Sequence, residues 1–187
     1  GAKPSAVEAA QVPCPHGMSA DEPDELLCEG AELVRFEQYD AFMEKQHAML
    51  ACVGVHDEDG ACAYLPALEA ELQRYQEQAY LLDPYLERLV VPVAQAMRTQ
   101  VLESNCVSMV PVARLLYMYT KVRGYKVVSR FFPHQVREMP LLLDVLERFE
   151  SPTWECLYVL LLWLSSMVPP FSTIAEPSVT PLLSRLP

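Results

Sequence analysis

Apolar side chains recur every three to four residues along most of the chain after residue 30, which is the spacing of an amphipathic α-helix. The first stripe runs from Leu33 to Val53 and stops at Gly54, which predicts one long helix and a break. The charged segment 56–60 is expected to be a loop. A second helix is expected over 62–82, where leucines and tyrosines continue the stripe.

Punctuating residues predict where the later helices begin and end. Asp83 is a favoured N-cap residue and Pro84 suits a first helical position, so a third helix is expected to start there, bend at Pro92 and reach about residue 103. Gly124 is expected to end the fourth helix. The helices expected after the third cover residues 108–123, 127–132, 136–149 and 153–168, and the pattern restarts at Thr180–Pro181.

This organisation predicts an all-α fold without a βαβ spacing. Successive antiparallel helix pairs are typical of a bundle or of the start of a HEAT/armadillo-like α-solenoid, and periodicity alone does not separate the two. Residues 1–30 combine proline with acidic side chains and are expected to be a disordered or loosely attached arm, whereas residues 31–187 form the helical repeat segment. Because the chain starts at Gly1 and stops just after the pattern restarts, it is expected to be a piece of a longer protein.

Charge is distributed unevenly along the chain. The net charge of −11 argues against nucleic acid as a partner, because phosphate binding relies on lysine and arginine. Residues 104–137 nevertheless carry no acidic side chain and six basic ones: Arg114, Lys121, Arg123, Lys126, Arg130 and Arg137. The candidate partner-binding residues are Lys121, Arg123, Lys126 and Arg130. The alternatives are a solvated helix face, or bridges within the chain to acids such as Glu138 or Asp144.

Candidate chemistry is sparse. The six cysteines include no CxxC pair, which favours reduced thiols in the cytosol and predicts no disulfide, no metal and no cofactor. Gly124 is the only glycine between residues 61 and 187, so the sequence has no glycine-rich phosphate-binding loop there. A catalytic pair of Cys106 or Cys156 with His134 can be named, but burial in an apolar helix would suppress the reactivity of Cys156. We therefore expect no enzyme activity.

The most apolar stretch runs from Cys156 to Leu164, nine residues, whereas a membrane span needs about 20. It is expected to be a buried core helix, without a membrane span. Its buried side chains are expected to include Leu160, Leu161, Trp163 and Leu164, and core packing is also expected for Trp154.

Three stretches carry more than helical periodicity. They are Tyr75-Gln-Glu-Gln-Ala-Tyr-Leu-Leu-Asp-Pro-Tyr-Leu-Glu87, then Leu116-Tyr-Met-Tyr-Thr-Lys-Val-Arg-Gly-Tyr-Lys126 continuing to Phe131-Phe-Pro-His-Gln-Val136, and Trp154-Glu-Cys-Leu-Tyr-Val-Leu-Leu-Leu-Trp-Leu-Ser165. In this order and spacing they resemble the amino-terminal region of the tubulin-folding cofactor D family over about residues 70–172. The chain departs from the family pattern at Gln135, Leu157 and Ser172, where the family has Glu, usually Arg, and Asp.

The resemblance implies an α-solenoid of HEAT-like repeats that captures β-tubulin. With tubulin-folding cofactors E and C and an Arf-like small GTPase, such a protein helps assemble or dissociate the αβ-tubulin dimer, and assists GTP hydrolysis without catalysing it. It also implies a cytoplasmic location at the microtubule cytoskeleton and centrosome. The alternatives are a generic HEAT/armadillo adaptor or transport scaffold, and a helical hydrolase that uses Cys156 or Cys106.

Overall fold

The computed structural model describes residues 35–168, and the structural statements below refer to this part of the chain. Several expectations lie outside the described residues: the arm over residues 1–30, the start of the first stripe at Leu33, Cys14, Cys28, Ser172 and the restart at Thr180–Pro181.

The described residues form helices and no strand, which confirms the all-α class. The longer helices are α1 (Tyr39–Gly54), α2 (Glu58–Gln73), α3 (Leu86–Leu102), α4 (Cys106–Arg123), α6 (Met139–Arg148) and α7 (Trp154–Met167). Shorter helical segments connect them: the 3₁₀ helix η1 (Ala79–Tyr85), α5 (Tyr125–Val128), and the 3₁₀ helices η2 (Ser129–Phe131) and η3 (Val136–Glu138).

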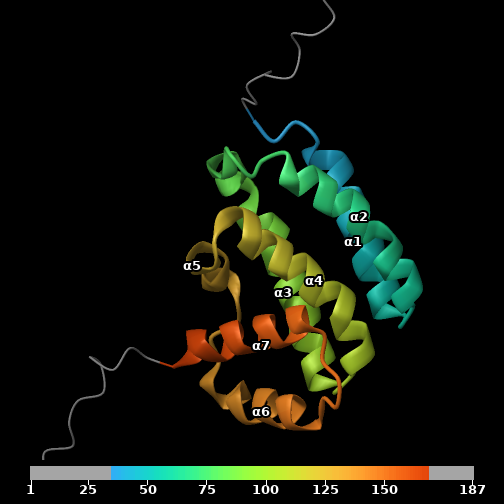
Figure 1. Ribbon diagram of the computed structural model, residues 1–187, viewed down its shortest axis with the longest axis vertical. Helices are drawn as coiled ribbons and strands as arrows, with labels where there is room; N and C mark the ends of the chain where they lie inside the picture. Colours follow the sequence, from blue (N-terminus) through green and yellow to red (C-terminus); the bar gives the residue numbers. More distant parts are fainter. Residues whose placement is uncertain (1–34, 169–187) are drawn as a thin grey trace, which may run out of the picture. The chain divides into compact units, whose positions relative to one another are not determined.

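The long helices form antiparallel pairs that stack in two layers (Figure 1). The pairs are α1 with α2, α3 with α4, and α6 with α7, each joined by a short connection. The first helices contact one another in the order α1, α3, α6, and the second helices in the order α2, α4, α7. This succession is the packing of helical repeats, as expected for a HEAT/armadillo-like solenoid.

Helix α4 lies at the centre of the stack, because it contacts α1, α2, α3, α5 and α7. Eleven of its residues are buried, so it shows no single apolar stripe. One buried polar group in this core bonds through both its nitrogen and its oxygen: the amide of Gln46 on α1 donates to the carbonyl of Leu89 at 2.9 Å and accepts the hydroxyl proton of Tyr119. These hydrogen bonds tie α1, α3 and α4 together at the core.

Several predicted boundaries are wrong. The second helix, expected over 62–82, ends at Gln73, and the helix expected over 127–132 starts at Tyr125. Helix α2 starts at Glu58 because the Asp57 side chain caps it by accepting from the Gly60 amide, so most of the expected loop over 56–60 is helical. Asp83 and Pro84 lie inside η1 and do not start a helix, since α3 begins at Leu86. The carboxylate of Asp83 binds Arg123 instead of capping.

Helix α7 has one buried and one exposed face, which corrects part of the prediction for its apolar run. Leu160 and Trp163 are buried as expected, but Leu161 is 48% exposed and Leu164 is half-buried. Trp154 is 57% exposed and packs edge-on against Tyr117 with ring centroids 4.5 Å apart, so it is no core residue.

Candidate protein interface

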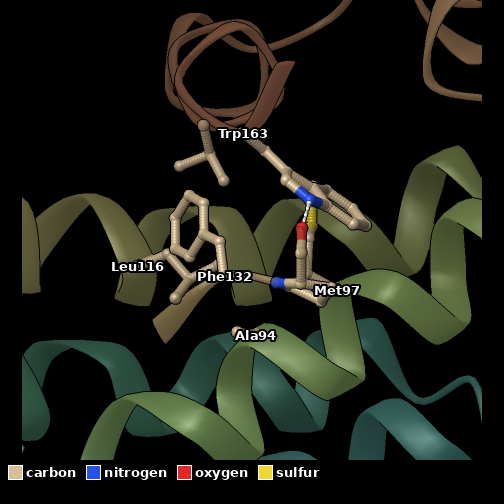
Figure 2. A pocket seen from close by; sticks show the side chains of 7 residues that line it. Ala94, Met97, Leu116, Phe132 and Trp163 are labelled. Atoms are coloured by element: carbon tan, nitrogen blue, oxygen red, sulfur yellow. Dashed lines mark hydrogen bonds between the residues drawn. The ribbon is translucent and has the colours of Figure 1, made fainter. Parts of the chain in front are cut away.

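The loop over residues 132–138, which follows η2 and includes η3, is fixed at its start by α7. The indole N–H of Trp163 donates to the carbonyl oxygen of Pro133 at 2.6 Å, and Figure 2 shows its ring pointing from α7 toward α3 and α4. Trp163 packs there with Met97 and Phe132 so closely that no water molecule fits between the lining side chains. This contact docks α7 onto the preceding helix pair.

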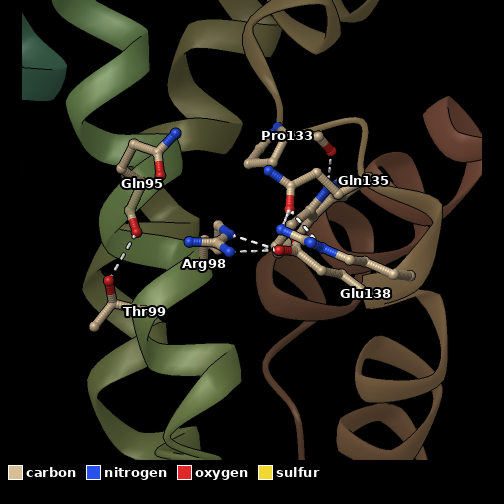
Figure 3. Close-up of polar contacts among 8 residues, drawn as sticks. Gln95, Arg98, Thr99, Pro133, Gln135 and Glu138 are labelled. Atoms are coloured by element: carbon tan, nitrogen blue, oxygen red, sulfur yellow. Dashed lines mark hydrogen bonds and ion pairs between the residues drawn. The ribbon is translucent and has the colours of Figure 1, made fainter.

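The same loop is fixed at its end by an ion pair with α3 (Figure 3). Both Nε and Nη2 of Arg98 donate to Oε1 of the buried Glu138, at 2.8 and 2.5 Å. These hydrogen bonds raise the pKa of Arg98, so the guanidinium remains charged. Each of the residues 134–137, between the anchors at Pro133 and Glu138, is exposed to solvent. Arg137 donates two hydrogen bonds to the side-chain oxygen of Gln135. An anchored loop with exposed side chains is a common form of recognition element.

Among the sequence-predicted binding residues, Arg123 has a partner within the chain. Its guanidinium forms an ion pair with the carboxylate of Asp83, including an Nη2–Oδ2 hydrogen bond of 2.7 Å. Hydrogen bonding to Arg123 lowers the pKa of Asp83 and raises the pKa of Arg123 itself. Arg123 therefore forms a bridge within the chain, which was one of the alternatives to partner binding. The acid is Asp83 and not Glu138 or Asp144.

The other three cations have no ion pair within residues 35–168. Lys126 and Arg130 are exposed on α5 and η2, and Lys121 is exposed on α4 beside a narrow depression next to α2. The acids expected to neutralise them are engaged elsewhere, since Glu138 binds Arg98 and Asp144 binds Arg148. The structure thus separates the basic residues: Lys126 and Arg130 lie on one short segment, Lys121 lies toward α2, and Arg123 is paired.

Sequence reasoning missed an apolar groove beside α5. Tyr125 of α5 and Tyr158, Leu161, Leu162 and Ser165 of α7 line an open groove of about 340 Å³. The exposed apolar face continues along α7 through Trp154, Leu157 and Val168. The only available signal was the spacing of these residues, and the run is apolar on all sides, so its periodicity could not separate exposed from buried positions.

The candidate nucleophiles are poorly placed for catalysis. Cys156 is fully buried, and burial raises the pKa of its thiol, with a smaller opposing effect from the hydrogen bond with Thr153. Cys106 is half-buried with its thiol toward the carbonyl of Ser104, and within residues 35–168 neither thiol is hydrogen-bonded to His134. These arrangements favour inert thiols.

A second polar cluster joins the α1–α2 and α3–α4 turns. The hydroxyl of Ser108 donates to Glu58 at 2.8 Å, and the amide of Asn105 lies 2.8 Å from Nδ1 of His56. Ser108 is fully buried and its proton is directed to the carboxylate, so it cannot meet a substrate. The cluster fixes one helix pair to the next.

Other classes of site can be described briefly. In the described part of the chain no group of three or more His, Cys, Asp or Glu side chains could hold a metal ion, and Cys52, Cys62, Cys106 and Cys156 are free thiols. No helix of residues 35–168 is both long and apolar enough to cross a membrane.

Comparison with known proteins gives one consistent family. A sequence profile described as tubulin-specific chaperone D-like, ARM repeat, matches residues 72–174. Tubulin-folding cofactor D of Schizosaccharomyces pombe is 35% identical over 94 residues, which cover 50% of this chain and 8% of that protein. The match thus covers less than a tenth of that relative's length. No solved structure matches the chain.

Proposed function

Because the chain belongs to the tubulin-specific chaperone D-like family, we propose that it is a segment of an α-solenoid that binds β-tubulin and helps to assemble and dissociate αβ-tubulin dimers. The observation that carries this proposal is the family match over residues 72–174, which covers α3 through α7 in the stacked arrangement of repeats. The segment acts beside tubulin-folding cofactors E and C and an Arf-like small GTPase, in the cytoplasm at the microtubule cytoskeleton and centrosome.

The contact with these partners uses the exposed cations. Lys121, Lys126 and Arg130 are exposed and have no ion pair within the described residues, so they are available to an acidic protein surface. Arg123 contributes less, because contact with a partner would compete with Asp83. Electrostatic attraction of this kind mainly accelerates association.

The segment supports this function without catalysis. The buried thiol of Cys156 has a raised pKa, and Ser108 is inaccessible, so neither side chain is an activated nucleophile. Labelling with a thiol reagent at neutral pH, followed by peptide mass mapping, should modify Cys156 more slowly than the half-buried Cys52 and Cys106. Preferential labelling of Cys156 would contradict this account and favour a helical hydrolase that uses this thiol.

Binding to tubulin distinguishes the proposal from a generic adaptor. The 187-residue chain is mixed with purified tubulin and resolved by size-exclusion chromatography, in parallel with a labelled basic transport-signal peptide. Co-elution with tubulin and no binding of the peptide supports the proposal. Binding of the peptide without tubulin identifies a transport adaptor instead.

A further inference from the structure

We propose that the groove between α5 and α7 binds a protein segment in which apolar side chains are flanked by carboxylates. This inference rests on the proposed function, since it names the chemistry of the partner at the same surface. The groove is lined by Tyr125, Tyr158, Leu161, Leu162 and Ser165 and has a volume of about 340 Å³.

The walls of the groove suit an apolar side chain. Ser165 supplies its only side-chain hydroxyl other than those of the two tyrosines, and no charged residue lines it. A small-molecule site usually encloses its ligand and directs several polar groups at it, whereas this groove is shallow and open. Side chains presented by another protein therefore fit it better.

One wall is held in place by aromatic packing. Tyr158 lies edge-on to Tyr117 with centroids 5.4 Å apart, and Tyr117 lies edge-on to Trp154. These contacts restrict the rotamer of Tyr158 before any partner arrives, which lowers the entropic cost of binding. Tyrosine and tryptophan are also the side chains most often found at the energetic centres of interfaces.

The charge beside the groove identifies the flanking groups. Lys126 follows Tyr125 directly in α5, Arg130 comes one turn later, and both are exposed. Residues 156–167 of α7 contribute no charged side chain, and residues 104–137 contribute no acid. An apolar centre with a cationic edge is complementary to an apolar segment with carboxylates on its flanks.

A second copy of the chain is a poorer occupant. The net charge of −11 makes association of two copies electrostatically unfavourable. Residues 156–167 of α7 carry no charge, so two such faces would not attract each other, and the cations beside the groove would have to find acids elsewhere on the second copy.

The test uses a fluorescein-labelled synthetic peptide in which two leucines are flanked by glutamates, titrated into the 187-residue chain by fluorescence anisotropy. Saturable binding is expected for this peptide. Two control peptides, one with serine in place of leucine and one with glutamine in place of glutamate, should each have an affinity at least about five-fold lower.

Variants locate the binding. Leu161→Asp and Tyr125→Ser should each weaken peptide binding about five-fold or more, and Lys126→Glu with Arg130→Glu should weaken it most at low salt. The matched controls are Leu143→Asp, a similarly exposed leucine on α6, and Lys45→Glu with Arg88→Glu, exposed cations on α1 and α3. If Leu161→Asp lowers the melting temperature, its loss of binding could come from unfolding, and the result for Tyr125→Ser then decides whether the groove binds the peptide.

The outcomes separate this inference from the proposed function. Absence of saturable binding, equal binding of the glutamine peptide, or equal losses in the control variants would overturn it, even if the chain binds tubulin. Loss of a dimer in Leu161→Asp without peptide binding would also overturn it, in favour of a second copy. Peptide binding at the groove without tubulin binding would leave this site intact and remove the proposed function.

Discussion

Arg123 at the end of α4 binds the carboxylate of Asp83 in η1 through two hydrogen bonds, one of them 2.7 Å long. The pair joins residues separated by 40 positions and fixes the segment before α3 against the end of α4. Because hydrogen bonding to Arg123 lowers the pKa of Asp83, the contribution of this pair to stability depends on pH.

Replacement of Asp83 by Asn should lower the free energy of unfolding at pH 7 by about 1 kcal/mol or less, since both side chains are partly exposed and water screens the pair. The folded-state pKa is depressed, so the stabilisation is present above the ordinary carboxyl pKa of about 3.9 and is lost as the pH falls through the lowered value. Urea denaturation from pH 7 to pH 3 measures both effects. The difference between wild type and the Asp83→Asn variant should shrink as the pH falls below about 4. Glu150→Gln, at an exposed acid without an ion pair in the described residues, is the matched control. A constant difference would contradict this account.

Trp163 is predicted to be the most costly residue of α7 to truncate. Trp163→Ala should lower the free energy of unfolding by about 3–5 kcal/mol, because a buried indole leaves a cavity. Trp163→Phe retains a buried ring but leaves the Pro133 carbonyl without its donor, which should cost about 1–2 kcal/mol. Urea denaturation with Trp154→Ala as control, at about 1 kcal/mol, tests the distinction. Equal losses for both tryptophans would show that α7 is not docked through Trp163.

Two glycines should respond to alanine in opposite directions. Gly124 has φ 95°, which an L side chain rarely adopts, so Gly124→Ala should destabilise the protein by about 1–3 kcal/mol although a Cβ there would meet no neighbour. Gly54 ends α1, has no positive φ, and a Cβ there would also meet open space. Gly54→Ala should stabilise the protein by about 0.5–1 kcal/mol. Thermal melting of both variants checks this, and a tolerated Gly124→Ala would contradict the positive φ at this position.

Local signals explain which helix ends could be predicted from the sequence. Gly124 ends α4 through its own positive φ, so that end was predicted correctly. The end of α1 at Gly54 also matches the prediction, although Gly54 itself has no positive φ. Asp83 and Pro84 form an equally good local signal, but a distant arginine takes the carboxylate, and a contact across 40 positions is invisible to local patterns. The prediction of the all-α class does not depend on such boundaries, because it rests on the presence of several helices and not on where each one ends.

The candidate site was less predictable. Exposure of Lys126 and Arg130 could be expected from apolar neighbours such as Val128, which is buried. The separation of Lys121 from these two depends on how α2 packs against α4, and no spacing along the chain encodes it. Leu161 could not be distinguished from Leu160 because every position around that turn of α7 is apolar.

The association rate of the chain with purified tubulin is the most direct measurement of the central claim. We predict that the wild-type chain binds tubulin and that Lys126→Glu with Arg130→Glu slows association. The difference should be largest at low salt and shrink as salt screens the charges, with the dissociation rate and melting temperature nearly unchanged. Lys45→Glu with Arg88→Glu controls for the change in net charge. Failure of the wild-type chain to bind tubulin would contradict the proposed function, and an unchanged association rate in the Lys126 and Arg130 variant would contradict the assignment of these cations to the interface.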